Sequence, residues 1–387
     1  MVTGSKELIR DINSHLVLEA VVNYGPISRA DLAKRLGLTK ATISAIVQVL
    51  IENDLIREIG SKATDKGRKP ILLDLNQEAG YVFSLDISVE YVTLLICDLK
   101  GRHCRIKQRP NSACGVEILP MIKELLKESI DELPKSAYGV VGISVGIHGV
   151  VHNNEVVFTP YYSLEGVDLA GELAGCFHVP VYIENEANLS VQGERSFYFH
   201  YPNIINISVH SGIGLGILID DKLYTGSNGY AGEFGHTIIM PDGRPCPCGN
   251  HGCIEQYASE RSLLLEFAQK KNRRRVSIDD FMDYYRKGDS DAADTISNFV
   301  KYMGIGINNI LNTFNPDLIV INSSFTMYIP DLPSMLQDSL KNRMDKYCRI
   351  LPSGLQDTAI LLGGACVVIQ NFLGINTLHL IPDETKS

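Results

Sequence analysis

Three helical stretches open the chain, each marked by the spacing of its apolar residues. From Glu7 to Tyr24 apolar side chains recur every three or four positions, and Gly25-Pro26 ends that pattern. Ser28 stands where it can cap a second helix that stops at Gly37, and Thr39 stands before a third, KATISAIVQVLIEND. Two helices joined by a short turn predict a helix-turn-helix, whose second helix enters the DNA major groove.

Two short β-like runs follow the helices. Beyond Asp54 the chain reads LIREI, a polar tip and PILLDLN, which is typical of a β-hairpin wing. Separately, three helices are more often plain packing and a charged run is more often a solvated face, but this order of elements favours DNA binding. We therefore predict a winged helix-turn-helix DNA-binding domain over residues 1–78. The expected DNA contacts are Arg29, Lys40, Thr42 and Ser44 in the helices and Arg68 and Lys69 in the basic wing.

Strands alternate with helices in the remainder, residues 79–387. YVFSLDISVEYVTLLICDLKG predicts two strands turning at residues 88–90, and a third is expected near residues 103–108. VEILPMIKELLKESIDEL has the period of an amphipathic helix, and YGVVGISVGIHGVV reads as a buried strand entering a glycine turn. INISVHSGIGLGILIDDKLYTG repeats that opening. The pattern predicts an α/β domain of two lobes, an arrangement that favours a cleft between them.

The composition agrees with a globular protein of more than one domain. The 387 residues are 45% hydrophobic and 21% charged, which argues against disordered, collagen-like and rod-like chains. Neither an apolar run of about 18 residues nor a leader-like stretch is evident, so we expect a cytoplasmic protein without a membrane partner. The net charge is −9, but the first 76 residues hold 11 Lys plus Arg against 9 Asp plus Glu, and the rest hold 25 against 36. A mildly basic head on an acidic body is compatible with DNA binding.

Three of the nine cysteines lie close together after a histidine. Cys246, Cys248 and Cys253, with His236, give the spacing H-x9-C-x-C-x4-C and a donor set of three thiolates and one imidazole. Glycines between them allow the tight turns that such a set needs. We predict a closed, structural zinc site in the loop over residues 236–253. His251 is a competing imidazole that we expect at the surface, and free thiols in a loop are the alternative.

Several motifs together resemble the ROK family, which comprises repressors and sugar kinases of the actin-like ATPase (ribonuclease H-like) fold. They are IENEAN at 183–188, SGIGLG at 211–216, GYAGEFGH at 229–236 and CPCGNHGC at 246–253, joined to a helix-turn-helix head that the family's kinases lack. The resemblance covers essentially the whole chain. Within the family, PISRADLAKRLGLTKATIS, GRKPILLDLN and PVYIENEAN are particularly similar to the xylose repressors of bacilli. The resemblance implies a two-lobed sugar-sensing domain over residues 79–387.

The resemblance also implies sugar-binding roles. In the family, the Asn and acid of the ENEAN motif, the Glu and His of EFGH, and the Glu two residues past the last zinc cysteine hydrogen-bond sugar hydroxyls. Carboxylates and an amide suit a sugar ring because its hydroxyls both donate and accept. The histidine would use one ring nitrogen for zinc and the other for sugar. The alternatives are that Asn185 and Glu186 cap a helix and that Glu233 and Glu255 are solvated loop acids. The residues here are Asn185, Glu186, Glu233, His236 and Glu255.

The chain departs from the family's kinases in three places. The kinases hold phosphate in an Asp-x-Gly-Gly-Thr turn, whereas this chain has Asp86-Ile87-Ser88-Val89-Glu90, whose side chains and charge disfavour a polyphosphate. Where the kinases have a catalytic Asp, Glu186 is one methylene longer. We therefore expect no ATP and no catalytic residue, with SGIGLG a retained glycine turn or a plain hairpin. His148 stands where relatives usually have proline, and either contacts a ligand hydroxyl or is a structural, hydrogen-bonded histidine.

These observations together predict a sugar-responsive transcriptional repressor with a structural zinc ion. It would bind double-stranded operator DNA as a homodimer, with paired heads on half-sites about 34 Å or a multiple apart. A monosaccharide, D-xylose being the expected effector, would release it. The alternatives are an ATP-dependent hexokinase-like member of the family, and a repressor that answers glucose, an amino sugar or a phosphosugar.

Overall fold

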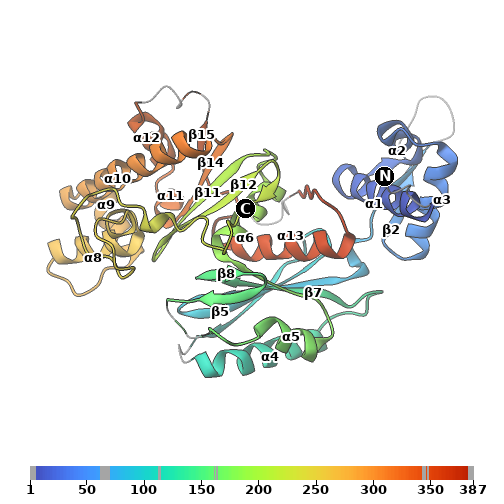
Figure 1. Cartoon of the computed structure of the whole chain (residues 1–387), viewed down its shortest axis with the longest axis horizontal. Helices are drawn as coiled ribbons and strands as arrows, with labels where there is room; N and C mark the ends of the chain where they lie inside the picture. Colours follow the sequence, from blue (N-terminus) through green and yellow to red (C-terminus); the bar gives the residue numbers. More distant parts are fainter. Residues whose placement is uncertain are drawn as a thin grey trace. The chain divides into compact units, whose positions relative to one another are not determined.

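The computed structural model describes residues 6–61, 70–111, 115–160, 162, 164–341, 346 and 348–381, and Figure 1 traces its elements. The chain divides into two compact units. Unit 1 comprises Met1–Glu186, Ser196–His200 and Leu361–Ser387, and unit 2 comprises Ala187–Arg195 and Tyr201–Ile360. Each unit has a five-stranded sheet and a hydrophobic core of its own.

The head of unit 1 is a helix-turn-helix, as predicted. The Ser28 hydroxyl accepts the Asp31 N–H at 3.2 Å, and the Thr39 hydroxyl accepts the Thr42 N–H at 3.1 Å, so both predicted caps form. Gly37 ends the second helix with a φ of 66°, a left-handed conformation that glycine adopts without strain. The elements are α1 (Lys6–Tyr24), β1 (Ile27–Ser28), α2 (Arg29–Leu36), α3 (Lys40–Glu52), β2 (Ile56–Ser61) and β3 (Ile71–Leu75).

The predicted wing is the hairpin of β2 and β3. These strands pair antiparallel, with Ile56 opposite Leu75. Residues 62–69, between the strands, lie outside the described residues, and so do the predicted DNA contacts Arg68 and Lys69. The buried residues of α3 pack with α1, α2 and β2, which leaves the opposite face of α3 exposed.

A five-stranded mixed sheet forms the body of unit 1. Its strand order is β10-β7-β4-β5-β6, in which β4, β7 and β10 run parallel. The predicted turn at residues 88–90 joins β4 to β5. The parallel strands end level with one another at Ile87, Ile147 and Asn185, so the residues that follow them gather at one edge. The strands are β4 (Tyr81–Ile87), β5 (Tyr91–Asp98), β6 (Arg105–Pro110), β7 (Val140–Ile147) and β10 (Val181–Asn185), with the hairpin β8 (Val150–His152) and β9 (Glu155–Phe158) after β7.

Helices cover both faces of this sheet (Figure 1). On one face α4 (Gly115–Asp131) and α5 (Leu169–Phe177) bury apolar side chains against the strands, and α13 (Ala359–Leu373) lies on the other face. α13 comes very close to the strands. A Cβ atom at Gly364 would lie 2.3 Å from the Ser84 Oγ and 2.7 Å from the Ser144 Oγ. The approach therefore requires glycine at this position.

The segment Gln356–Leu373, which contains α13, is long and apolar enough to cross a membrane. Its mean hydropathy is 1.2 over 18 residues, and 61% of it is buried inside the protein. The sequence did not reveal it as an apolar run because glutamine, aspartate and glycine interrupt it. The core helix of a globular unit has the same composition, and α13 occupies that place in unit 1.

Unit 2 has the same strand topology as the body of unit 1. Its strand order is β13-β12-β11-β14-β15, with β11 antiparallel to β12 and parallel to β14. The SGIGLG motif spans the tight turn and first residues of the β11–β12 hairpin. The strands are β11 (Ile204–Val209), β12 (Ile213–Ile219), β13 (Lys222–Leu223), β14 (Leu318–Ser323) and β15 (Arg349–Pro352).

The helices of unit 2 surround an aromatic core formed by residues such as Phe281, Phe299 and Phe325. Part of α6 belongs to this unit. The Glu194 carboxylate of α6 accepts the N–H groups of Gly354 and Leu355, each at 3.1 Å, and so fixes the helix to the loop after β15. The helices are α6 (Glu186–Phe197), α7 (Glu255–Ala258), α8 (Glu260–Lys270), α9 (Ile278–Arg286), α10 (Ser290–Phe314), α11 (Ser324–Tyr328) and α12 (Leu332–Ser339).

Valine in place of Gly364 should lower the free energy of unfolding by about 1–3 kcal/mol, because the two serine hydroxyls leave no room for its side chain. Gly175 is a matched control, since it also lies inside a helix but a Cβ there meets nothing within 4 Å. Gly175→Ala should raise the free energy of unfolding by about 0.5–1 kcal/mol. Urea unfolding followed by circular dichroism measures both, and equal effects would contradict the close packing of α13.

Candidate functional site

Asn185 and Glu186 lie where β10 ends and α6 begins, at the edge where the parallel strands of unit 1 end. The Asn185 Nδ2 donates to the Gly149 carbonyl at 2.8 Å, in the turn after β7. A side chain at Gly149 would not fit, because its Cβ would lie 2.2 Å from the Phe158 carbonyl oxygen. The Asn185 amide is therefore held beside this turn.

The Glu186 carboxylate has one oxygen, Oε2, that is buried and without a hydrogen-bond partner among the described residues. Such atoms are uncommon in folded proteins because burial removes their bonds to water. A carboxylate oxygen at the carboxyl end of a parallel sheet is placed to accept a hydrogen bond from a ligand. A sugar hydroxyl is one group that could donate it.

Asp86, near the end of β4, pairs with His148, in the turn after β7. The His148 Nε2 and the Asp86 Oδ1 are 2.9 Å apart. Burial lowers the pKa of His148, but the charge and hydrogen bond of Asp86 and the charge of Glu186 outweigh it and raise this pKa to about 9. The ring is therefore an imidazolium at neutral pH. The Tyr162 hydroxyl accepts the His148 N–H at 3.3 Å and donates to the Ile87 carbonyl at 2.6 Å.

Four donor side chains of unit 2 converge as the sequence predicts. The ligand atoms of His236, Cys246, Cys248 and Cys253 all lie within 4.8 Å of one another. The Cys248 and Cys253 sulfurs are 3.7 Å apart, and the Cys246 sulfur is 3.5 Å from the His236 Nδ1. In a tetrahedral site with Zn–S about 2.3 Å and Zn–N about 2.0 Å, donor atoms lie about 3.5–3.8 Å apart. The four residues fit a tetrahedral metal site and could hold an ion, while His251 is exposed, as expected.

The loop of residues 236–253 reaches this arrangement through tight turns. Gly252 has a φ of 82°, and a Cβ there would lie 1.7 Å from the Met240 carbonyl oxygen. Burial and the neighbouring thiols raise the pKa of Cys253 to about 12. A bound cation would lower this pKa again because it stabilises the thiolate.

Glu233 and Glu255 flank the imidazole of His236. The Glu255 Oε1 is 3.8 Å from the His236 Nδ1, and the Glu233 Oε2 is 3.9 Å from the Nε2. Because Nδ1 faces the sulfurs, Nε2 is the nitrogen turned toward Glu233. A Cβ at Gly212 or Gly235 would lie 3.2 Å or 3.1 Å from the Glu255 Oε2, so the glycine turn of the hairpin borders this group. The structure thus brings together the three predicted sugar-binding residues of unit 2, and the other two belong to unit 1.

In the head, Lys40 and Ser44 are exposed on the face of α3 that the core does not use. Gln48 is exposed on the same face, four residues further along. The sequence prediction missed Gln48, although its spacing from Ser44 is the signal that could have found it. The Gln48 amide bonds the Glu52 carboxylate at 2.9 Å.

Two other predicted DNA contacts have partners within the head. The Thr42 hydroxyl is 2.8 Å from the Thr39 hydroxyl, so it takes part in the cap of α3. Arg29 pairs with Glu58 of β2 at 2.9 Å, which links the start of α2 to the wing. Both residues therefore have a structural role besides the predicted one.

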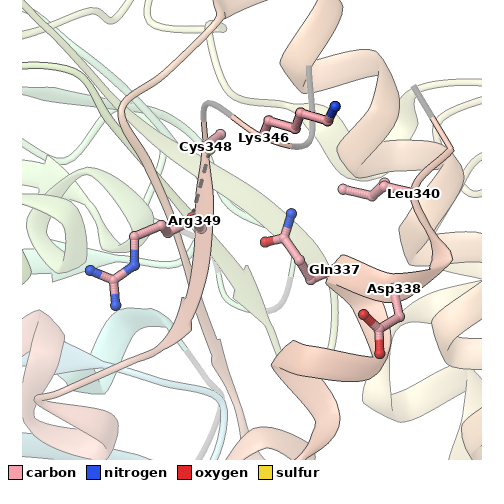
Figure 2. A pocket seen from close by; sticks show the side chains of 6 residues that line it. All are labelled: Gln337, Asp338, Leu340, Lys346, Cys348 and Arg349. Atoms are coloured by element: carbon pink, nitrogen blue, oxygen red, sulfur yellow. Dashed lines mark hydrogen bonds between the residues drawn. The ribbon is translucent and has the colours of Figure 1, made fainter. Parts of the chain in front are cut away.

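Unit 2 also contains a hollow of about 540 Å³ beside α12 and β15 that the sequence did not suggest (Figure 2). Its charged side chains point in different directions and share no centre. Burial raises the pKa of the Cys348 thiol to about 11, so this thiol stays protonated at neutral pH. The hollow is lined by Gln337, Asp338, Leu340, Lys346, Cys348 and Arg349.

Comparisons with known proteins agree with this architecture. The ROK family matches residues 82–371, and the MarR family matches residues 11–66. The xylose repressor of Bacillus spizizenii is 35% identical over 380 residues, which cover 96% of this chain and 98% of the repressor. A ROK-family transcriptional regulator, solved as a homologue of the Escherichia coli MLC protein, has a TM-score of 0.80 at 25% identity and covers 94% of this chain and 97% of its own.

The family's kinases share the fold of the body. A ROK glucokinase from Streptomyces griseus, solved with glucose and AMPPNP, has a TM-score of 0.66 at 23% identity and covers 99% of its own chain but 74% of this one. The predicted domain boundary at residue 78 lies between the two family matches. The matches confirm the predicted fold, a helix-turn-helix joined to an actin-like body, and the chain belongs to the ROK family.

Proposed function

We propose that the protein is a transcriptional repressor that binds operator DNA through its head and releases it when D-xylose binds the body. One observation carries the proposal: the chain joins a helix-turn-helix head to a ROK body. The head exposes one face of α3. In the body, the Glu186 Oε2 is buried and has no hydrogen-bond partner among the described residues. Similarity to a xylose repressor over nearly the whole chain supports the choice of sugar.

On the DNA side, we propose that α3 enters the major groove. Lys40 lies in its first turn, where recognition helices contact base edges or phosphates, and Ser44 and Gln48 follow on the same face. Arg29 reaches a phosphate only if it shares or leaves its ion pair with Glu58. Paired heads of a homodimer would bind two half-sites, and Arg68 and Lys69 would add contacts from the wing.

On the sugar side, we propose hydrogen-bonding roles for two residues of unit 1 and three of unit 2, each unit taken by itself. In unit 1, Asn185 offers an amide and Glu186 a carboxylate. In unit 2, Glu233 lies on the Nε2 side of the His236 ring and Glu255 on the Nδ1 side, so the unit offers two carboxylates and an imidazole close together. Several acceptors and few donors suit a ligand that carries many hydroxyls, because each hydroxyl must find a partner when it leaves water.

We propose that the ion held by His236 and the three cysteines is structural zinc. Zinc would hold the thiols as thiolates and fix the loop of residues 236–253, beside which Glu233 and Glu255 lie on either side of His236. With Nδ1 on the metal, His236 would keep a protonated Nε2 toward the ligand. Order in the loop and binding of the sugar would then depend on each other.

The turn after β4 supports a sensor rather than a kinase. Asn111 fastens residues 88–90, since its Nδ2 donates to the Ser88 carbonyl at 2.6 Å and its N–H donates to the Glu90 carbonyl at 2.8 Å. The Asp86 carboxylate is engaged by His148. A polyphosphate needs backbone N–H groups, and its Mg²⁺ needs free carboxylates. This turn carries the acidic side chain of Glu90, and the nearby Asp86 carboxylate is already bonded, so both requirements are poorly met.

Operator release by D-xylose is the direct test. In fluorescence anisotropy at fixed salt, millimolar D-xylose should weaken binding to DNA flanking the protein's own gene about tenfold, because a typical coupling free energy is about 1–3 kcal/mol. Glucose and N-acetylglucosamine should have little effect. Replacing Lys40 and Ser44 with Ala should weaken DNA binding without affecting sugar binding.

Two outcomes of that experiment, and one of a separate kinase assay, would revise the proposal. Specific DNA binding that ignores D-xylose would discard this sugar and keep the repressor. No specific DNA binding would remove the repressor. Formation of ADP with a sugar in a coupled assay, abolished by Glu186→Gln, would establish the kinase alternative.

Cys248→Ser should release the metal and abolish the response to sugar, while the head still binds operator DNA. The bound zinc should fall from about one ion per chain toward none, because a structural site uses all four ligands. Cys176→Ser is the control, since Cys176 is an exposed cysteine of α5 outside the cluster. Metal analysis by mass spectrometry and anisotropy measure the two effects. Equal zinc content in both variants would contradict the ligand assignment.

A further inference from the structure

His148 lies at the same edge of unit 1 as the proposed sugar-binding residues. Its neighbour Gly149 accepts the Asn185 amide at 2.8 Å, and its ring bonds Asp86, one residue before the end of β4. The parallel strands therefore deliver His148, Asn185 and Glu186 to one place. Open α/β sheets bind their ligands at this edge.

The His148 ring is held in a fixed orientation but retains one nitrogen for another partner. Its Nε2 bonds Asp86, and its backbone N–H bonds the Tyr162 hydroxyl. Within the described ranges Asp86 is the one side chain that hydrogen-bonds this ring, and 20% of the His148 side chain is exposed. An imidazolium donates from both nitrogens, so its Nδ1–H has a hydrogen bond to give.

The charges around this ring disfavour an anionic ligand. Asp86 and Glu186 both act on His148 through their charges. One imidazolium beside two carboxylates leaves the cluster with net negative charge, which repels a phosphate and accepts a neutral sugar.

We propose that His148 is a further sugar-binding residue that donates its Nδ1–H to a hydroxyl of the ligand, and that Asp86, His148 and Glu186 together select neutral sugars over sugar phosphates. The proposal rests on the proposed function and deepens it.

Calorimetry with D-xylose and D-xylose 5-phosphate tests the proposal. His148→Gln keeps a polar group but loses the charge, and should weaken D-xylose binding about tenfold, as expected for a hydrogen bond from a charged donor. His152→Gln is the control, four residues further along in strand β8, and should leave the affinity within about twofold. The wild-type protein should bind the sugar phosphate far more weakly than D-xylose.

The dependence of affinity on pH separates a binding role from a structural one. Wild-type affinity for D-xylose should fall as the pH rises through about 9, where the imidazolium loses its proton. Asp86, Glu186 and Tyr162 face the ring, and burial raises the pKa of Tyr162 so that it stays protonated there. His148→Gln should lack this fall.

The possible failures are distinguishable. If His148→Gln binds D-xylose as the wild-type protein does, the role of His148 is wrong and the proposed function stands. If D-xylose 5-phosphate binds as tightly as D-xylose, the charge selection is wrong. If the wild-type protein binds no neutral sugar, the proposed function falls and this inference falls with it.

A second, independent set of contacts links the end of α6 to residues 376–380, which follow α13. The Leu380 N–H donates to the Ser196 carbonyl at 2.8 Å. The rings of His200 and His379 lie face to face at a tilt, with centroids 4.3 Å apart. All of these residues belong to unit 1.

The same segment is bonded to α1 of the head. The Asn23 Oδ1 accepts the His379 N–H at 2.8 Å, and the Asn23 Nδ2 donates to the Thr377 carbonyl at 3.0 Å. The Glu19 Oε1 accepts the Thr377 N–H at 3.1 Å. The Glu19 Oε2 accepts the Asn376 N–H at 3.4 Å, so two side chains of α1 hold four backbone groups of this segment.

We infer that residues 376–380 couple sugar binding to the head. α6 begins at Glu186, a proposed sugar-binding residue, and ends where this segment is bonded, so a shift of α6 acts on the segment and through it on α1. Coupling of this kind needs a physical connection between elements whose arrangement the ligand biases. The inference rests on the proposed function.

Asn23→Ala tests this coupling. It should leave the affinity for D-xylose within about twofold, while the loss of operator affinity caused by D-xylose falls from about tenfold to threefold or less. Asn371→Ala is the control, because the Asn371 amide bonds the Val367 carbonyl within α13 at 2.8 Å. Thr377→Val, which removes the hydroxyl that Asn23 and Glu19 contact, should act in the same direction.

Wild-type coupling in both Asn23→Ala and Thr377→Val would overturn the inference. A wild-type protein that binds D-xylose and DNA with no effect of one on the other would overturn the proposed function instead. Thermal melting of each variant shows that any change in coupling occurs in a folded protein.

Discussion

The close packing of α13 on the sheet of unit 1 connects parts of the protein that are far apart in the chain. Gly364 permits it beside Ser84 and Ser144, and a Cβ at Gly142, on the strand beneath, would lie 2.9 Å from the Val368 Cγ1. α13 begins in unit 2, crosses to unit 1 and ends at the segment that bonds the head. Any residue that lifted this helix from the sheet would disturb the body and its link to the head together.

The charged groups at the edge of unit 1 support the proposal that a body with the fold of sugar kinases acts here as a sensor. Asp86 is bonded to a histidine rather than free for a metal ion. Burial lowers the pKa of His148, but Asp86 and Glu186 outweigh it and raise this pKa to about 9, so the ring is an imidazolium at neutral pH. An enzyme uses binding energy to stabilise a transition state. Where a site binds a neutral ligand and transfers no phosphoryl group, the binding energy can instead shift a conformational equilibrium.

The cysteine loop brings four side chains that could hold a metal ion beside two acidic residues. Its four donor atoms fit a tetrahedral ion, and Glu233 and Glu255 lie on either side of His236, one of the four residues. A loop of this length is too short to build an apolar core of its own. A bound metal ion would order it instead and so hold the neighbouring acids in place. The second nitrogen of a metal-bound histidine takes a defined protonation state, so it can act as a directed donor.

The sequence by itself determined the local features of this protein. The caps of α2 and α3, the wing strands and the donor set of the cysteine loop all depend on residues a few positions apart, and the structure has them as the pattern predicts. The ENEAN and EFGH motifs pointed to the sugar-binding residues, whose role stays a prediction.

Only the tertiary structure decided which distant side chains meet. Asp86 and His148 are 62 residues apart, and Asn23 and Thr377 are 354 apart. Their contacts follow from the strand order β10-β7-β4 and from the path of α13. An apolar pattern shows that a strand is buried, but it does not show which strand lies beside it, because every buried strand presents the same backbone hydrogen bonds.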